Sequence, residues 1–372
     1  MRISYNPLWQ NWGEQRPARQ FVQEEMELLL QTEELGFDII LCPEHHFDQD
    51  YSACPDNFLA LTYVAARTER IQLGLGAVIV PWNDPLRVVE KFSMLDHLSD
   101  GRCQIGFGRG LAKIEYDRFG LDMNESRERF NEGYEMIMRG LRTGIVEGDG
   151  PHYKQPRAEV VPVPRPELAD NVINVGMSPE SATNAGGFGG ELLMFMTKGI
   201  EDTMPLIQGY YDKYTETTGK RPPAPTTTDF VYCHEDADEA ARLGALYAGR
   251  YFVSVVRHYS FDGKHFAETK GYEAYAEGAQ AIRDVGMDVA TQAYVDCQAG
   301  IGTPEQIIEK YRHRMDVMGP CHAAGAFYYA GMTKDEADRS TRLFSSEVMP
   351  EIRKIYDEAV AKQETQTAGA AS

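Results

Sequence analysis

Short apolar runs alternate with longer amphipathic segments along most of the chain. A continuous apolar run, such as Ile39 to Cys42, is typical of a buried parallel strand, whereas apolar residues spaced three and four apart favour a helix. We predict strands at residues 2–6, 39–42, 71–80, 103–107, 172–176, 192–196, 227–233 and 323–329. Between and after them we predict helices at residues 18–36, 57–70 (capped by Asn57), 85–98, 125–142 and 236–257, one opened by Ser178-Pro179, one ending near Thr218, one opened by Thr303-Pro304, and one ending near Val360.

Eight strands, each linked to the next by a helix, predict one α/β domain over residues 1–360. The number and order of the elements fit a TIM (β/α)₈ barrel with insertions. Residues 258–300 lack clear periodicity, so we expect them to form a mobile insertion at the active site. We expect residues 361–372 to be a disordered tail.

Composition narrows the function classes. The 372 residues carry a net charge of −20, which argues against nucleic acid and anionic membranes as partners, since both bind clustered cations. The acidity itself predicts little beyond solubility. The chain has no apolar stretch long enough to span a membrane, no apolar signal-peptide core at its start, and no CxxC pair among its six cysteines. We therefore expect a cytoplasmic enzyme with reduced thiols.

A cluster of titratable residues, Glu44, His45 and His46, follows the strand at 39–42. In a parallel barrel the exits of the strands share one mouth, where catalytic residues gather. Adjacent histidines on an extended segment point to opposite sides, which disfavours a metal site built from this pair. A general base or hydrogen-bond donor at His45 or His46 is favoured, and two ordinary hydrogen-bonded histidines stay possible.

Two further strand exits suggest binding of an anion. Arg109 lies between Gly108 and Gly110, where backbone can approach a ligand that the guanidinium binds. Ser178 and Pro179 open a helix whose N-terminus suits a phosphate, and Arg127 could add a second cation. A surface salt bridge at Arg109 and an ordinary helix cap at Ser178 are the alternatives. Neither GxGxxG nor GxxxxGK[ST] occurs, so no dinucleotide fold or P-loop is indicated.

The strand at 71–80 carries small residues near its exit. Gly76 and Ala77 leave room for a flat ring to lie against the backbone. The alternative interpretation is that these small residues only allow the strand to pack against a helix.

Together these motifs resemble the bacterial luciferase-like family of flavin-dependent monooxygenases. Any one of the matching stretches is unspecific, but they run in one order through nearly the whole chain. The stretches are Glu44 to Phe47, Leu73 to Pro81, Asp100 to Arg102, Gly106 to Gly110, Phe119 to Arg127, Val175 to Ser181, Gly302 to Pro304 and Phe344 to Pro350.

The resemblance implies a barrel that binds reduced FMN supplied by a separate NAD(P)H:flavin reductase. It implies reaction with O₂, through a flavin hydroperoxide, to oxygenate a small apolar organic substrate. It assigns His45 as the active-site base or peroxide-stabilising group. It also assigns cofactor binding to Gly76 and Ala77 (a cis pair under the flavin ring), to Arg109, Arg127, Ser178 and Ser181 (phosphate), and to the backbone of Met177.

Some residues depart from the family pattern. Gly108 replaces a cysteine that luciferases place near the flavin, which weighs against light emission from a long-chain aldehyde. Met177 replaces a glutamate, so a contact at this position is expected from the backbone rather than from the side chain. A deazaflavin-dependent hydride-transfer oxidoreductase and a non-catalytic flavin-binding protein are the alternative functions.

The family also implies a partner surface and a cover for the site. We expect a homodimer formed through helices 57–70 and 85–98, with apolar positions such as Leu59, Tyr63, Phe92 and Leu95. We expect Tyr259, Phe261 and Phe266 to belong to a lid that excludes water.

Overall fold

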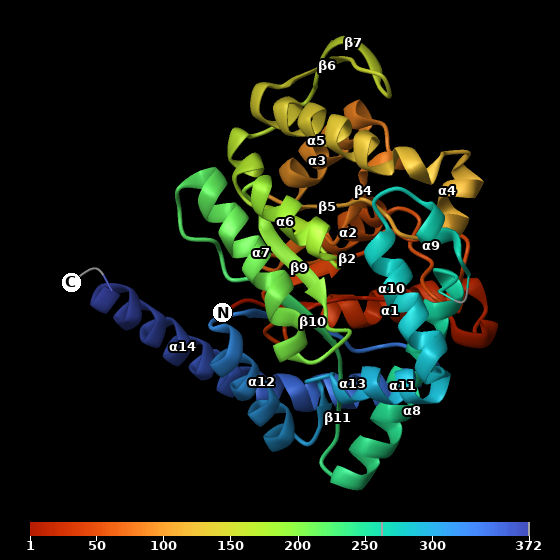
Figure 1. Ribbon diagram of the computed structural model, residues 1–372, viewed down its shortest axis with the longest axis vertical. Helices are drawn as coiled ribbons and strands as arrows, with labels where there is room; N and C mark the ends of the chain where they lie inside the picture. The colour runs from red at the N-terminus through yellow and green to blue at the C-terminus, as the bar shows by residue number, and fades with distance from the viewer. Residues whose placement is uncertain (262, 371–372) are drawn as a thin grey trace.

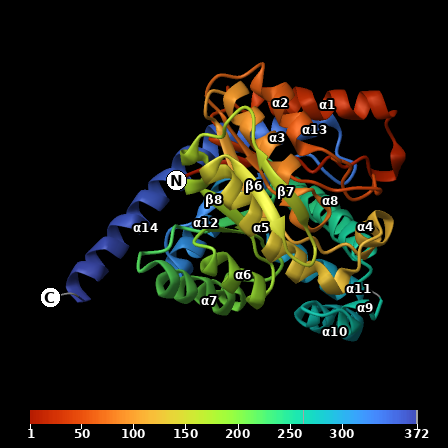
Figure 2. The same ribbon diagram turned by 90° about the horizontal axis from the view of Figure 1, so that it is seen from above.

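Eight parallel strands close into a barrel in the computed structural model, which describes residues 1–261 and 263–370. The hydrogen-bonded order is β3-β2-β1-β13-β10-β9-β8-β5-β4, and an additional pairing of β3 with β5 closes the ring (Figures 1 and 2). The strands are β1 (Ile3–Tyr5), β2 (Ile39–Cys42), β3 (Gln72–Leu75), β4 (Val78–Ile79), β5 (Cys103–Gly108), β8 (Val172–Val175), β9 (Glu191–Phe195), β10 (Thr226–Phe230) and β13 (His322–Ala326). We count β3 and β4 as two parts of one barrel strand, which gives eight. The predicted TIM-like barrel is confirmed.

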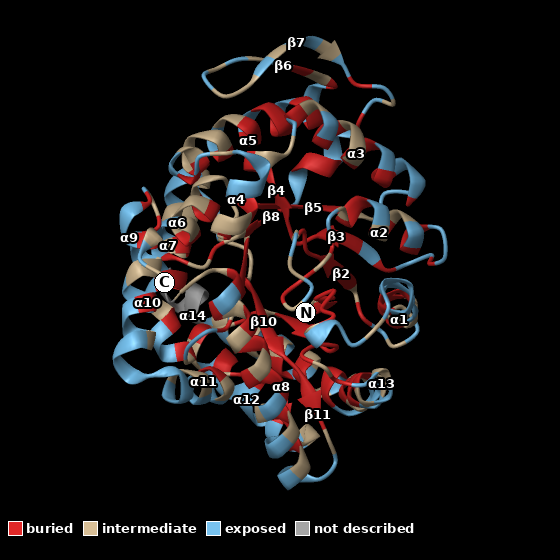
Figure 3. Cartoon of the chain, turned by 90° about the vertical axis from the view of Figure 1, so that its right-hand side faces the viewer, coloured by how far each residue is buried: buried red, intermediate tan, exposed pale blue. Residues whose placement is uncertain are grey.

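Helices surround the barrel, and their exposed sides face outward (Figure 3). Those that follow the barrel strands are α1 (Ala18–Gln31), α2 (Asn57–Ala65), α3 (Pro85–Leu98), α4 (Lys113–Phe119), α5 (Ser126–Thr143), α6 (Pro179–Gly187), α7 (Ile200–Thr218), α8 (Ala237–His258), α12 (Pro304–Met318), α13 (Lys334–Leu343) and α14 (Met349–Ala370). Two small two-stranded sheets join β6 (Ile145–Asp149) to β7 (Lys154–Glu159) and β11 (Tyr232–Cys233) to β12 (Ile301–Gly302). No helix in the described part of the chain is long and apolar enough to cross a membrane.

The two faces of each strand bury different cores. Ile39 and Leu41 of β2 belong to a small cluster with Ile173, Leu193 and Ala324, each from a different barrel strand. Their neighbours in β2, such as Ile40, join the larger cluster shared with the surrounding helices. Because side chains alternate along a strand, a run that is apolar at every position supplies both cores.

The predicted strand at 71–80 is interrupted where small residues were noted. It divides into β3 and β4, and the Gly76–Ala77 peptide bond between them is cis. The buried Asn57 side chain donates hydrogen bonds to the carbonyl oxygens of Cys42 (3.2 Å) and Ala77 (3.1 Å). Asn57 is therefore not the helix cap that the sequence suggested; Asp56 caps α2 by accepting from the Leu59 N–H.

Residues 258–300 are more regular than expected. Past the end of α8 they form α9 (His265–Glu268), α10 (Glu273–Val285) and α11 (Met287–Asp296). At the C-terminus α14 continues to Ala370, so the helix covers residues where a disordered tail from 361 was expected. The last two residues of that expected tail, 371–372, lie outside the described residues.

The expected dimer surface needs one correction. Phe92 and Leu95 on α3 are completely buried in the core and cannot contact a second chain. Leu59 and Tyr63 on the neighbouring α2 are exposed. The periodicity of α3 identified an apolar face correctly, but that face packs on the barrel.

The buried Glu25 on α1 predicts a pH-dependent stability. Its side chain has an oxygen without a hydrogen-bond partner among the described residues, and burial raises the pKa of Glu25 to about 8, against the opposing charge of Arg16. Because the folded pKa is raised, stability is greatest below the ordinary glutamate range and falls as the pH rises to about 8, by roughly 5 kcal/mol in total. We expect Glu25→Gln to flatten this fall, as measured by urea unfolding between pH 4.5 and 8.5.

Glu24→Gln is the matched control for that experiment. Hydrogen bonds from Gln20, Arg16 and Tyr328 outweigh burial and lower the pKa of Glu24, so its removal should leave the fall in place. Parallel pH curves for wild type and Glu25→Gln would contradict the prediction.

Candidate active site

Glu44 organises the loop at the exit of β2 and β4. Its buried carboxylate accepts hydrogen bonds from the Trp82 Nε1–H (2.7 Å), the Asn83 side-chain amide (2.9 Å) and the Ile79 backbone N–H (3.1 Å). Nε2 of His46 lies 3.2 Å from Oε1 of the same carboxylate. Glu44 and His46 therefore form a structural group, and His45 points elsewhere.

His45 meets a buried carboxylate from α4. Its Nδ1 lies 3.2 Å from Oε1 of Glu115, and the same oxygen accepts the backbone N–H of His46 at 2.7 Å. The side chain of Glu115 is 1% exposed and that of His45 is 19% exposed. Burial alone would raise the pKa of Glu115, but His45, His258 and the hydrogen bonds lower it on balance, so the group stays a carboxylate.

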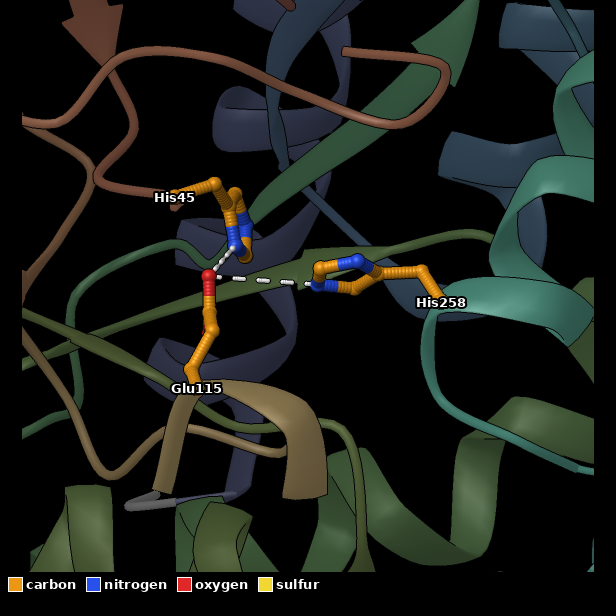
Figure 4. A group of neighbouring side chains, drawn as sticks. All are labelled: His45, Glu115 and His258. Atoms are coloured by element: carbon orange, nitrogen blue, oxygen red, sulfur yellow. Dashed lines mark hydrogen bonds and ion pairs between the residues drawn. The ribbon is translucent and has the colours of Figure 1, made fainter. Parts of the chain in front are cut away.

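His258, at the end of α8, also points at the Glu115 carboxylate (Figure 4). Its Nε2 lies 3.8 Å from Oε1 of Glu115, and its Nδ1 lies 3.0 Å from Oδ2 of Asp48. The ring of Tyr51 stacks on the His258 ring, with centroids 4.1 Å apart. Burial lowers the pKa of His258, although the hydrogen bond to Asp48 opposes the change.

The residues predicted to bind an anion lie together at the start of α6. Ser178 caps this helix, and Ser178 and Ser181 form a reciprocal capping box. Arg127 forms an ion pair with Glu180 in the first turn of the same helix, with Nε and Oε1 3.0 Å apart. Burial and the nearby charge of Arg109 lower the pKa of Arg127, so the two guanidinium groups lie close enough to repel each other.

The segment before α10 covers these arginines. Nη2 of Arg109 donates to the carbonyl oxygen of Gly271 at 2.7 Å, and the Tyr272 ring lies under the guanidinium at 3.9 Å. Nη1 of Arg109 and Nη2 of Arg127 are buried without a hydrogen-bond partner among the described residues. Two desolvated cationic donors without acceptors are costly, and an anion placed between them would satisfy both.

Helix α4 connects the histidine cluster to the arginine cluster. Glu115 binds His45, while the hydroxyl of the next residue, Tyr116, donates to the backbone carbonyl oxygen of Arg109 at 2.5 Å. Tyr259, which follows His258, also packs with the aromatic residues around Tyr116 and Tyr272. The structure therefore brings His45, Arg109 and the Ser178 cap into one neighbourhood at the barrel mouth.

The remaining predicted site residues, Gly76, Ala77 and Met177, pack locally in the structure. Gly76 and Ala77 lie between β3 and β4, and a side chain on Gly108 would contact Ala77 and Ile79. The sulfur of Met177 accepts the backbone N–H of Phe195 at 3.1 Å, so its side chain packs against β9.

Sequence reasoning missed four residues of the site. Glu115 contacts His45 from 70 positions away, and His258 contacts Asp48 from 210 positions away. Asp48 and Tyr51 lie near His45 in the chain, and the Tyr51 ring packs against both histidine rings. An acidic residue in the first turn after a barrel strand was the signal available for Glu115. Nothing in the local pattern indicated His258.

Known proteins resemble this chain over most of its length. The sequence profile described as luciferase-like monooxygenase matches residues 1–321. The alkanal monooxygenase alpha chain of Photorhabdus luminescens is 27% identical over 324 residues, which cover 86% of this chain and 88% of that protein. The chain therefore belongs to the luciferase-like monooxygenase family.

Solved structures share the fold at lower identity. The monooxygenase RslO1 from Streptomyces bottropensis has a TM-score of 0.78 at 24% identity, covering 94% of this chain and 99% of that one. The oxygenating constituent of 3,6-diketocamphane monooxygenase from Pseudomonas putida, solved with FMN, has a TM-score of 0.74 at 17% identity, covering 94% and 98%. An F420-dependent secondary alcohol dehydrogenase, solved with an F420–acetone adduct, has a TM-score of 0.69 at 18% identity, covering 94% and 98%.

Proposed function

We propose that this protein is a flavin-dependent monooxygenase that uses reduced FMN and O₂ to oxygenate a small apolar organic substrate. The observation that carries the proposal is the pair of guanidinium groups of Arg109 and Arg127 at the start of α6, which are buried and each keep a nitrogen without a hydrogen-bond partner among the described residues. Helix α4 joins this pair to the histidine cluster, because Glu115 contacts His45 and the next residue, Tyr116, contacts Arg109. Family membership and the FMN found in one structural relative support it.

The arginine cluster fits the phosphate of FMN. A terminal phosphate offers several acceptor oxygens, which match Nη1 of Arg109, Nη2 of Arg127 and the Ser178 hydroxyl at the helix start. Glu180 pairs with Arg127, and the Gly271 carbonyl oxygen accepts from Arg109. A phosphate would replace both of these acceptors.

FMN is favoured over F420 because Gly271 and Tyr272 cover the Arg109 guanidinium, and the unpartnered nitrogens of both arginines are buried. A terminal phosphate can end in such a closed position, whereas a phosphodiester with a polar tail needs an exit to solvent. A deazaflavin-dependent hydride transfer is the second candidate, favoured by the fold shared with an F420-dependent dehydrogenase. A protein that binds flavin without turnover is the third.

Reduced flavin, when bound, supplies the electrons that activate O₂. Glu115 accepts from Nδ1 of His45 and so keeps the proton on that nitrogen, which leaves Nε2 to take or return a proton at the mouth. Tyr51 packs its ring edge-on to His45 with centroids 4.9 Å apart, and Tyr259 binds the Tyr51 hydroxyl at 2.7 Å. These aromatic walls exclude water and suit an apolar substrate.

The chain needs partners for this reaction. No second nucleotide-binding motif is present in its sequence, so a separate NAD(P)H:flavin reductase supplies the reduced FMN by transient contact.

Removing the Arg127 guanidinium tests the phosphate site. We expect Arg127→Met to weaken binding of reduced FMN by about 10- to 100-fold, because one charge-assisted contact to phosphate contributes about 1.5–3 kcal/mol. Riboflavin, which lacks the phosphate, should bind wild type and variant equally. Anaerobic fluorescence titration measures both ligands.

Arg129→Met is the matched control, because Arg129 lies two positions along α5, is similarly shielded and pairs with Glu125 instead. It should change FMN affinity less than threefold. Equal losses for FMN and riboflavin in Arg127→Met, or tighter binding of F420 than of FMN by wild type, would contradict the proposal.

Oxygen transfer is tested with ¹⁸O₂ and reduced FMN on a panel of apolar aldehydes, ketones and arenes. We expect wild type to incorporate label into at least one class, and His45→Asn to lower that rate by about 10²- to 10⁴-fold while keeping FMN affinity. His313→Asn, an exposed histidine paired with Glu201, should keep the rate. Absence of label in every product, with consumption of reduced F420, would support hydride transfer instead.

We also propose a homodimer through α2 and α3, which pack side by side. Leu59 is 71% exposed, and Tyr63, Met94 and Leu98 are also exposed apolar residues on these helices. We expect light scattering to give a dimer at micromolar concentration and Leu59→Glu to give a monomer. Leu246→Glu, an exposed leucine on α8, should remain dimeric; a monomeric wild type would overturn the assignment.

A further inference from the structure

The histidine cluster contains a nitrogen that the proposed oxygenation does not use. Nε2 of His258 is buried, its side chain is 0% exposed, and it has no hydrogen-bond partner among the described residues. The atom points at Oε1 of Glu115, 3.8 Å away (Figure 4). A buried ring nitrogen aimed at a carboxylate without a bond between them requires an explanation.

Asp48 decides which nitrogen of His258 carries the proton. Oδ2 of Asp48 lies 3.0 Å from Nδ1, and a carboxylate can only accept, so Nδ1 holds the hydrogen. In the neutral ring Nε2 is then a lone pair facing the carboxylate oxygen of Glu115. Two acceptors that face each other in a buried position call for a cation between them.

His45 is the third residue beside the space between Glu115 and His258. Its ring nitrogen, the Glu115 oxygen and the His258 nitrogen all lie within 4.8 Å of one another. Ligands bound to zinc at about 2.0–2.1 Å in tetrahedral geometry lie about 3.3 Å apart, close to the 3.2 Å and 3.8 Å separations from Glu115. Two imidazoles and a carboxylate, with one position open, are the donor set of many catalytic zinc sites.

The surroundings of His258 match a metal ligand as well. A histidine that binds a metal usually donates its other ring N–H to a carboxylate, which fixes the ring and raises its basicity. Asp48 holds that place, and the stacked Tyr51 ring fixes the plane of the imidazole. The side chain of His45 keeps 19% exposure, which leaves an approach for an ion and a bound water.

We infer that His45, Glu115 and His258 form a binding site for one divalent transition-metal ion of the zinc class. The pattern of adjacent histidines had disfavoured a metal at His45 and His46, and the proposed site avoids that objection because His258 comes from α8. An ion bound to Nδ1 of His45 replaces the proton on that nitrogen and moves the single N–H of the ring to Nε2. His45 therefore cannot act as a base at Nε2 while the ion is bound.

The test is zinc binding by the full-length, chelator-treated protein, without flavin or O₂. Calorimetry with ZnCl₂ should give one ion per chain, and CoCl₂ should give the intense visible absorption of a four-coordinate site. His258→Gln should weaken Zn²⁺ binding by at least tenfold. Asp48→Asn keeps all three ligands and should weaken it by about 10- to 100-fold, as loss of a carboxylate behind a ligand histidine does.

His313→Gln is the matched control, since His313 and Glu201 form an exposed histidine–carboxylate pair at 2.8 Å, with no third ligand from the described part of the chain. It should bind zinc as wild type does. Circular dichroism checks folding, and Asp48→Asn decides the question if His258→Gln does not fold.

Two results would overturn the inference. The first is no zinc binding by wild type, which would mean that a proton on His258 fills the gap. The second is binding by both Asp48→Asn and His258→Gln within threefold of wild type, which would place the ion elsewhere. Because neither flavin nor oxygenation enters the measurement, failure of the proposed function would leave the zinc result unaffected.

Discussion

The buried carboxylate of Glu115 holds the barrel mouth together. One of its oxygens contacts the loop after β2 through the His46 N–H and the His45 ring, and the end of α8 through His258. Three segments from different parts of the barrel thus converge on a single atom with almost no access to water. A charge in such a position is tolerated only when donors or a cation lie around it, so the geometry of the loop, α4 and α8 must be maintained together.

The arginine cluster depends on the same helix. Tyr116 follows Glu115 in α4 and fixes the backbone of Arg109, so rotation or loss of α4 would disturb both the proton-handling and the anion-binding groups. The seven-residue helix α4 therefore contacts both parts of the site, the histidine cluster and the arginine cluster. These contacts fix the positions of loops that would otherwise be free to move relative to each other. Residues 271–272, which cover this part of the site, contact the Arg109 guanidinium in turn.

The barrel could be predicted from sequence because its signals are local. Apolar runs, caps such as Ser178 and Thr303, and prolines at first helical turns mark the elements without knowledge of their partners. The helices within 258–300 gave no such signal, since α10 buries only Ala279 and α11 only Tyr294. Helices that cover a mouth need no broad apolar stripe, so periodicity does not reveal them.

The site was predictable only in part, for a related reason. Arg109 and Ser178 stand out through glycines and capping residues beside them, whereas Glu115 and His258 matter through contacts distant in sequence. Phe92 and Leu95 show the opposite error: an apolar face was identified, but sequence alone does not say whether the barrel or a second chain covers it.

The arrangement around Glu44 has a consequence for redesigning the protein. Because one carboxylate serves Ile79, Trp82, Asn83 and His46, these positions form an interdependent set in which single exchanges leave an unmatched donor or acceptor. Attempts to change which compounds the protein accepts should therefore leave this rim intact. Substitutions are better made along α10 and α11, where few side chains are buried.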